Sequence, residues 1–190
     1  TPAPAARPAP AKPLQTEVYF NIGAAGNSVA TPGTSTVGLT GSSLTFTSAA
    51  VVADSVHRVV VSDQGASLSV SPPVQIASGL RNAAGMTFDA AGNLLLQDNG
   101  IDTEGNRGVS FSADELNRVD SADLGTVVPD FGFADTYVDY ATGATVGPTA
   151  GVTAPLVDFR PVNGERSEGA VEIAMAPDGF AADFDGGGVG

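Results

Sequence analysis

The sequence contains no cysteine and only one histidine, His57. Without thiols, neither disulfide bonds nor cysteine-ligated metal sites are available. Any catalytic triad that needs a histidine has to use His57. No apolar run approaches the ~18 residues of a membrane-spanning helix, which argues against membrane insertion. Stability must therefore come from a hydrophobic core, from sheet pairing or from bound ions.

Basic residues are also scarce. Lysine and arginine number 8 against 21 aspartates and glutamates, which gives a formal net charge of −13. Nucleic acids and anionic membrane surfaces require clustered basic side chains, so both are excluded as expected partners. An acidic balance suits a soluble protein or one that binds cations, although many extracellular proteins share it.

The chain has 190 residues, of which 42% are hydrophobic, enough for one domain with a sizeable core. It starts with TPAPAARPAPAKP, a Pro/Ala tract that favours extended conformations and cannot pack a core. No apolar central region of a signal peptide is visible there. We predict a spacer or disordered tail over residues 1–16 and a folded domain over residues 17–190.

The rest of the chain shows short β-branched and aromatic runs separated by turn residues, which is typical of strands. We expect strands at Glu17–Ile22, Val37–Thr40, Ser43–Phe46, Val56–Ser62, Leu68–Ile76, Met86–Asp89, Asn93–Gln97, Leu156–Arg160 and Val171–Met175. One short helix is predicted at Ser112–Val119, with Ser112 as its cap and Glu115 three residues on. The final segment GFAADFDGGGVG shows no periodicity. These patterns predict an all-β fold, either a sandwich or a propeller.

Three turn signals divide these runs. Gln64-Gly65 closes one strand, and the Asp-x-x-Gly sequence that ends at Gly92 joins two apolar runs as a hairpin. Pro72 and Pro73 cannot donate to a ladder, so their strand is predicted to be an edge or to be broken there.

Oxygen ligands crowd the segment after Leu96. A loop so rich in carboxylates repels itself unless water or a cation neutralises it. Calcium is the first hypothesis, and solvated or capping charge is the alternative. The loop is not an EF-hand, because Val109 stands where the bidentate glutamate would be. The candidate metal ligands are Asp98, Asn99, Gly100, Asp102, Glu104, Asp114 and Glu115, with Asn106 nearby.

The combination of GLRNAAGMTFD, LLLQDNGIDTEGN, SADELNRV and DFGFADTYVDYATGATVG resembles the glucose/sorbosone dehydrogenase family. The similarity runs from about Glu17 to the end and is closest to secreted bacterial members of unassigned substrate. The resemblance implies a six-bladed type of β-propeller. At ~40–45 residues per blade, the chain corresponds to about three to four blades, roughly half of the family's length.

For function, the resemblance implies calcium and pyrroloquinoline quinone (PQQ) as cofactors and oxidation of a sugar hydroxyl. Arg81 and Asn82 match the Arg-Asn pair that faces the quinone, Asp98-Asn99-Gly100 match the calcium loop, and Asp114-Glu115 match the motif that follows. The family's histidine base has no counterpart here. An extracellular or periplasmic location is expected.

An alternative function is a non-enzymatic extracellular structural or interaction module that associates through open sheet edges. The two remaining candidate sites favour structural roles. His57 precedes a valine run, which indicates a histidine on a strand face. The GAAG sequence at Gly23–Gly26 follows a strand, but no helix follows to supply the amide donors of a phosphate site.

Overall fold

The computed structural model describes residues 14–26, 29, 31–38, 49–65, 67–101, 112–159, 171–176 and 179–184, the last two ranges as backbone only. Several predictions lie outside these residues. They are the strand at Ser43–Phe46, the whole Pro/Ala tract, and the candidate ligands Asp102, Glu104 and Asn106.

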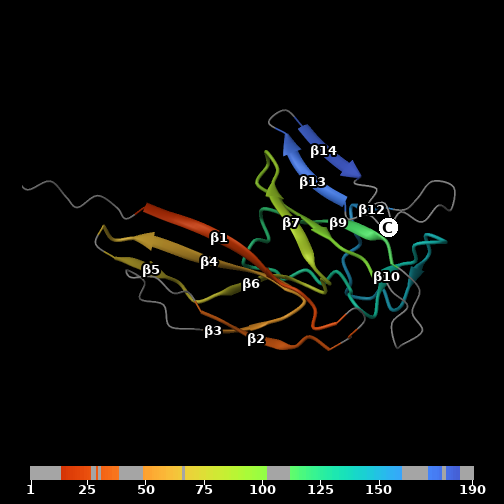
Figure 1. Cartoon of the computed structure of the whole chain (residues 1–190), viewed down its shortest axis with the longest axis horizontal. Coiled ribbons are helices and arrows are strands. Elements are labelled where there is room, and N and C mark those ends of the chain that lie inside the picture. The colour runs from red at the N-terminus through yellow and green to blue at the C-terminus, as the bar shows by residue number, and fades with distance from the viewer. Residues whose placement is uncertain are drawn as a thin grey trace, which may run out of the picture.

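The described chain is all-β, and its strands form several small antiparallel sheets (Figure 1). The first sheet consists of β1 (Leu14–Ile22), β4 (Ser55–Asp63), β5 (Leu68–Val70) and β6 (Val74–Ser78). β4 pairs with β1 along one edge and with β5 and β6 along the other. β1 begins at Leu14 rather than Glu17, so its first residues fall within the predicted tail.

Local turn chemistry shapes the first sheet as predicted. Gly65 closes the turn after β4 with a φ of 84°, and the Asp63 carboxylate accepts its N–H at 2.7 Å. Pro72 and Pro73 lie between β5 and β6 and break what would otherwise be one strand. That edge of the sheet is therefore interrupted, because neither proline has an N–H to donate.

The second sheet consists of β7 (Ala83–Phe88), β8 (Leu94–Asp98), β9 (Asp114–Val119) and β12 (Val157–Phe159), in the order β12-β9-β8-β7. The predicted hairpin is confirmed as β7 and β8. Its turn is held by the Asp89 side chain, which accepts the N–H groups of Ala91 and Asn93 at 2.8 and 2.9 Å. Gly92 supplies the positive φ of 81° that this turn requires.

The helix predicted at Ser112–Val119 was wrong, because residues 114–119 form strand β9. Ser112 does not cap a helix; its hydroxyl accepts the N–H of Ile101 at 2.6 Å. β8 pairs with β9 along its whole length, from Leu94 opposite Val119 to Asp98 opposite Glu115. A helix of two turns has little stability of its own, whereas the edge of β8 lets residues 115–119 form the hydrogen bonds of an antiparallel pair.

Three two-stranded ribbons complete the described chain. β2 (Thr34–Val37) pairs with β3 (Ala49–Val52), and β10 (Tyr137–Val138) pairs with β11 (Thr145–Val146). β13 (Val171–Ala176) pairs with β14 (Gly179–Phe184). β12 and β13 confirm predicted strands, and β2 shares only Val37 with the strand predicted at Val37–Thr40. β14 falls in the final segment, for which no strand was expected.

The main core lies between the two larger sheets. Val56, Ile76 and Ala77 of the first sheet meet Leu94 and Leu96 of the second, all fully buried. Leu80, Ala83, Val119 and Phe131 belong to the same cluster. Burial of each large aliphatic side chain contributes roughly 1.5–3 kcal/mol, so this cluster fixes how the sheets pack.

Candidate functional site

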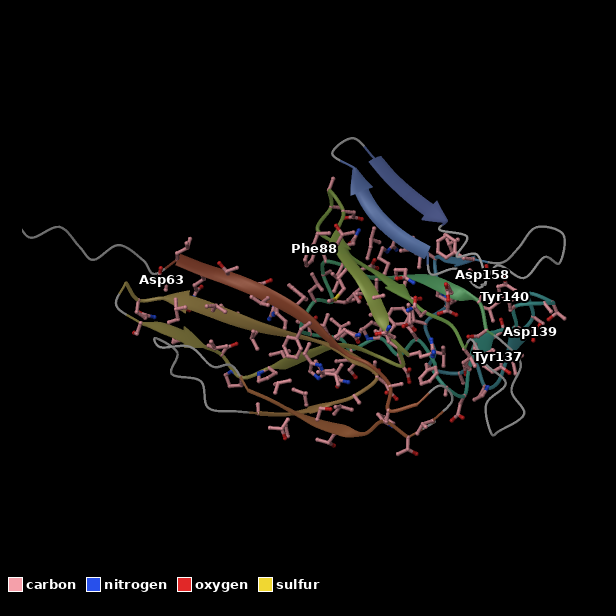
Figure 2. All side chains as sticks on the ribbon, viewed as in Figure 1. Asp63, Phe88, Tyr137, Asp139, Tyr140 and Asp158 are labelled. Carbon is pink, nitrogen blue, oxygen red and sulfur yellow. The ribbon has the colours of Figure 1, made fainter. Side chains whose placement is uncertain are left out.

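A row of carboxylates crosses the second sheet. Asp98 on β8 stands opposite Glu115 on β9, and Glu115 stands opposite Asp158 on β12. Directly opposed residues of antiparallel strands project to the same face. Because Leu94 and Leu96 share that face with Asp98 and lie in the core, the row (Asp98, Glu115 and Asp158) extends the core face of the sheet. Figure 2 shows Asp158 at the same end of the molecule as Tyr137, Asp139 and Tyr140.

Asp98 is buried and holds a backbone turn. One carboxylate oxygen accepts the Arg81 N–H at 3.0 Å, and the other accepts the Asn82 N–H at 2.7 Å. Burial raises the pKa of Asp98 to about 7, although these two hydrogen bonds and the Arg81 guanidinium act to lower it. Asp98 therefore fixes the Arg81-Asn82 turn next to the core.

Glu115 is the carboxylate with the least compensated charge. Burial, together with the nearby charges of Asp98, Asp158 and Asp114, raises the pKa of Glu115 to about 8. One hydrogen bond opposes this rise, from the Asn117 side-chain amide to Glu115 Oε2 at 3.3 Å. Within the described residues, no lysine or arginine side chain pairs with Glu115.

Asn117 adds an unused oxygen ligand beside Glu115. It lies two residues along β9 on the same face, it is fully buried, and its Oδ1 atom has no hydrogen-bond partner. A buried amide oxygen without a partner costs about 1–3 kcal/mol. Rotating the amide by 180° exchanges its oxygen and nitrogen, so Asn117 can present either atom to Glu115.

A small cavity of about 20 Å³ adjoins Asp98 and Glu115. That volume suits one water molecule or one ion. Phe131, Phe133 and Tyr137, from the segment that leads into β10, also line it. The residues that line the cavity are Gly79, Arg81, Asp98, Asn99, Gly100, Ser112, Ala113, Glu115, Phe131, Phe133, Thr136 and Tyr137.

The two residues predicted to face a quinone bind other parts of the chain. The Arg81 guanidinium donates to the Gly100 carbonyl at 2.6 Å, and the Asn82 side-chain oxygen accepts from the Asn21 amide at 3.1 Å. The cavity beside them is also far smaller than the ~300 Å³ or more of an organic cofactor site. Both side chains thus have partners within the chain, and their contact with PQQ stays a prediction from the resemblance.

Of the other predicted metal ligands, some line the cavity and others form hydrogen bonds elsewhere in the chain. Asn99 and Gly100 line the cavity, but the Asn99 side-chain oxygen accepts from Gln97 at 2.6 Å and the Gly100 N–H is bound by Asp114 at 2.6 Å. Among the described residues, no three His, Cys, Asp or Glu side chains gather into a ready-made metal site. The predicted set therefore divides, with Asp98 and Glu115 together at the cavity and Asp114 binding the loop backbone.

His57 and the GAAG segment make packing contacts and hydrogen bonds within the fold. The His57 ring is buried, stacks on Phe20 with 5.6 Å between ring centroids, and has its pKa lowered by burial. It lies on β4, in the first sheet, away from the carboxylate row. In the GAAG segment the Ala24 N–H donates to the Arg81 carbonyl at 2.7 Å, which connects this loop to the Arg81-Asn82 turn.

Sequence reasoning missed Asp158 and Asn117. Asp158 reaches the row only through the pairing of β12 with β9, which no local pattern signals. Asn117 falls on the same face as Glu115 once residues 114–119 are a strand, and the period-2 spacing of those two residues was the available signal.

No family model, curated protein or solved structure matches this chain. Within the described residues, no helix is long and apolar enough to cross a membrane.

Proposed function

We propose that this chain is an exported, calcium-supported all-β module that binds a hard divalent cation at the carboxylate row, with Glu115 as the principal ligand. The observation that carries the proposal is the environment of Glu115. Two other carboxylates, Asp98 and Asp158, lie directly opposite it on the core side of the sheet, and no described basic side chain offsets its charge. A bound cation would neutralise this concentration of negative charge.

The donor set favours calcium over softer or more demanding metals. All candidate ligands are oxygens, namely the carboxylates of the row, the Asn117 amide oxygen and nearby backbone carbonyls. Calcium accepts irregular shells of six to eight oxygens, whereas magnesium demands a near-ideal octahedron. The unpartnered Oδ1 of buried Asn117 supports the proposal independently of the acidic residues, since amide rotation would turn it toward an ion held by Glu115.

The scaffold in this proposal is part of a β-propeller. The second sheet supports it, because β7, β8, β9 and β12 are antiparallel and lie in chain order, as the strands of a blade do. The first sheet is less regular, since β1 pairs directly with β4 while β2 and β3 form a separate ribbon. Oxidation of a sugar hydroxyl with PQQ stays a prediction from the resemblance alone and is not part of this proposal.

Calcium-dependent thermal unfolding tests the proposal. The midpoint is measured at pH 7.5 with chelator, with calcium, and with sodium chloride at matched ionic strength. Calcium at about 100 times its Kd should raise the midpoint by roughly 5–10 °C through linkage. A midpoint that calcium leaves unchanged would overturn the proposal.

A pair of isosteric variants locates the site. Glu115→Gln should abolish the calcium shift, because the amide keeps the shape but not the charge. Glu17→Gln is the matched control, since Glu17 pairs with Arg58 at 3.0 Å on the first sheet, and it should keep the full shift. If both variants respond to calcium equally, the cation binds elsewhere and the assignment of this site fails.

A further inference from the structure

We propose that the outer edge of β1 pairs with β1 of a second copy of this chain, forming an antiparallel twofold dimer with Val18 at its centre. β1 spans nine residues and, in the described part of the chain, pairs with β4 alone. Among the described residues, no strand pairs with the opposite side of β1, so that side presents a row of backbone N–H and C=O groups without a strand partner. Such a row is a template for another strand.

The other edges of the two larger sheets each carry a device that discourages pairing. Pro72 and Pro73 interrupt the opposite edge of the first sheet. β7 has a register irregularity between Ala83 and Gly85, and β12 is only three residues long. Bulges, prolines and short strands are the means by which proteins protect open edges. β1 lacks all three, because it pairs with β4 without a break from Leu14 to Ile22.

The sequence of β1, LQTEVYFNI, suits pairing with itself. A twofold axis at Val18 brings all nine residues into register, with Val18 opposite Val18 and Leu14 opposite Ile22 of the second copy. Leu14 and Val18 are 73% and 42% exposed in the single chain. Because every opposed pair lies on the same face in this register, the apolar face of the sheet continues across the dimer.

In this register, no two like charges of the paired β1 strands stand opposite one another. Glu17 is the one charged residue of β1, and the Val18 axis places it opposite Tyr19 rather than opposite Glu17 of the second copy. Its charge is already offset, since Arg58 binds it at 3.0 Å and the Tyr19 hydroxyl donates to it at 2.8 Å. The net charge of −13 per chain acts against association at long range, so dimerisation should strengthen with salt.

The edge is remote from the carboxylate row, so this inference does not depend on the proposed function. Leu14 stands opposite Asp63, and Figure 2 places Asp63 at the end of the molecule far from Asp158. Figure 1 shows β1 along the outer margin of the first sheet.

A single introduced cysteine tests the register directly, because the chain has none of its own. Opposed residues of an antiparallel pair have Cα atoms ~4.5–5.5 Å apart, within the ~4.4–6.8 Å that a disulfide spans. Val18→Cys should form a covalent dimer with oxidised glutathione. Val74→Cys, at a site of similar exposure on β6 of the same sheet, is the control. Dimer formation should be at least about tenfold faster for Val18→Cys. Equal rates would overturn the inference.

Sedimentation measurements test the non-covalent dimer. The wild-type chain should dimerise as its concentration rises, more readily at about 0.5 M than at about 0.15 M salt. Val18→Lys and Val18→Glu should each be monomeric, because each opposes like charges at the axis, and their mixture should dimerise again. Val74→Lys should behave as wild type. A wild-type chain that stays monomeric at all concentrations, or single variants that still dimerise, would refute the pairing.

Discussion

Asp98 and Glu115 stand directly opposite one another across β8 and β9, on the face of the sheet that carries the core. Two carboxylates in such positions repel each other and resist burial. The chain compensates Asp98 with two backbone N–H groups and with Arg81, whereas Glu115 receives one side-chain amide. This asymmetry makes Glu115 the point at which a cation would contribute most and Asp98 the point at which structure is stabilised.

The structural role of Asp98 predicts a graded response to substitution. Asp98→Ala leaves the N–H groups of Arg81 and Asn82 without acceptors in a buried turn, which should cost about 3 kcal/mol of unfolding free energy. Asp98→Asn keeps one acceptor oxygen and should cost about half as much. Urea unfolding in the presence of chelator measures both. An alanine variant as stable as the asparagine variant would contradict this role.

Gly79 lies two residues before the Arg81-Asn82 turn, and a side chain added there should destabilise the fold by steric collision. Its φ is 67°, and an added Cβ would collide with the Asp130 side chain and with the backbone of Gly132. Gly79→Ala should therefore cost about 3 kcal/mol or more, from strain and overpacking together. Gly65→Ala is the control, because Gly65 has a φ of 84° but open space around it, and it should cost only about 1 kcal/mol. Equal losses in urea unfolding would show that the collision is relieved.

Local signals predicted the parts of the fold that local chemistry determines. The Asp89–Gly92 turn holds its hairpin through the Asp89 carboxylate, and Pro72-Pro73 divide β5 from β6, as their residue types require. β9 was predicted as helix because Ser112 and Glu115 have capping-box spacing. Pairing with β8 overrode that signal, and a single-sequence pattern does not contain that tertiary contact.

The candidate site was predictable in part for the same reason. The density of carboxylates after Leu96 singled out Asp98 and Glu115, and the structure places both at one cavity. Asp114 was grouped with them by sequence proximity, but it alternates to the other face of β9 and binds the Gly100 N–H. Asp158 joins the row from a distant strand, through register alone.

Asp54 predicts a stabilising substitution. It has a φ of 55°, it is buried, and its Oδ1 atom has no partner. Burial raises the pKa of Asp54 above its ordinary value, so its ionised form destabilises the fold increasingly as pH rises through that raised pKa. Asp54→Asn removes the charge, and asparagine tolerates a left-handed backbone.

The variant Asp54→Asn should be more stable than wild type by about 1 kcal/mol at pH 7, with a smaller gain at pH 4. Urea unfolding at the two pH values measures the difference. Asp120→Asn serves as the control, because Asp120 is exposed and pairs with exposed Arg118 at 2.7 Å, and it should change stability little at either pH. A gain at pH 4 as large as at pH 7 would rule out the ionised carboxylate as the cause.

His57 predicts a loss of stability in mild acid. Burial lowers the pKa of His57 below 6.5, and its Nδ1 atom has no partner. Below pH 6.5 the unfolded chain takes up a proton that the folded chain resists, so the stability that neutral His57 provides is complete above pH 6.5 and declines as pH falls toward the folded pKa. His57→Phe keeps a ring against Phe20 and has no proton to bind. The stability of wild type relative to this variant should therefore decrease between about pH 7 and pH 5. A constant difference in urea unfolding across that range would show that His57 does not titrate in this way.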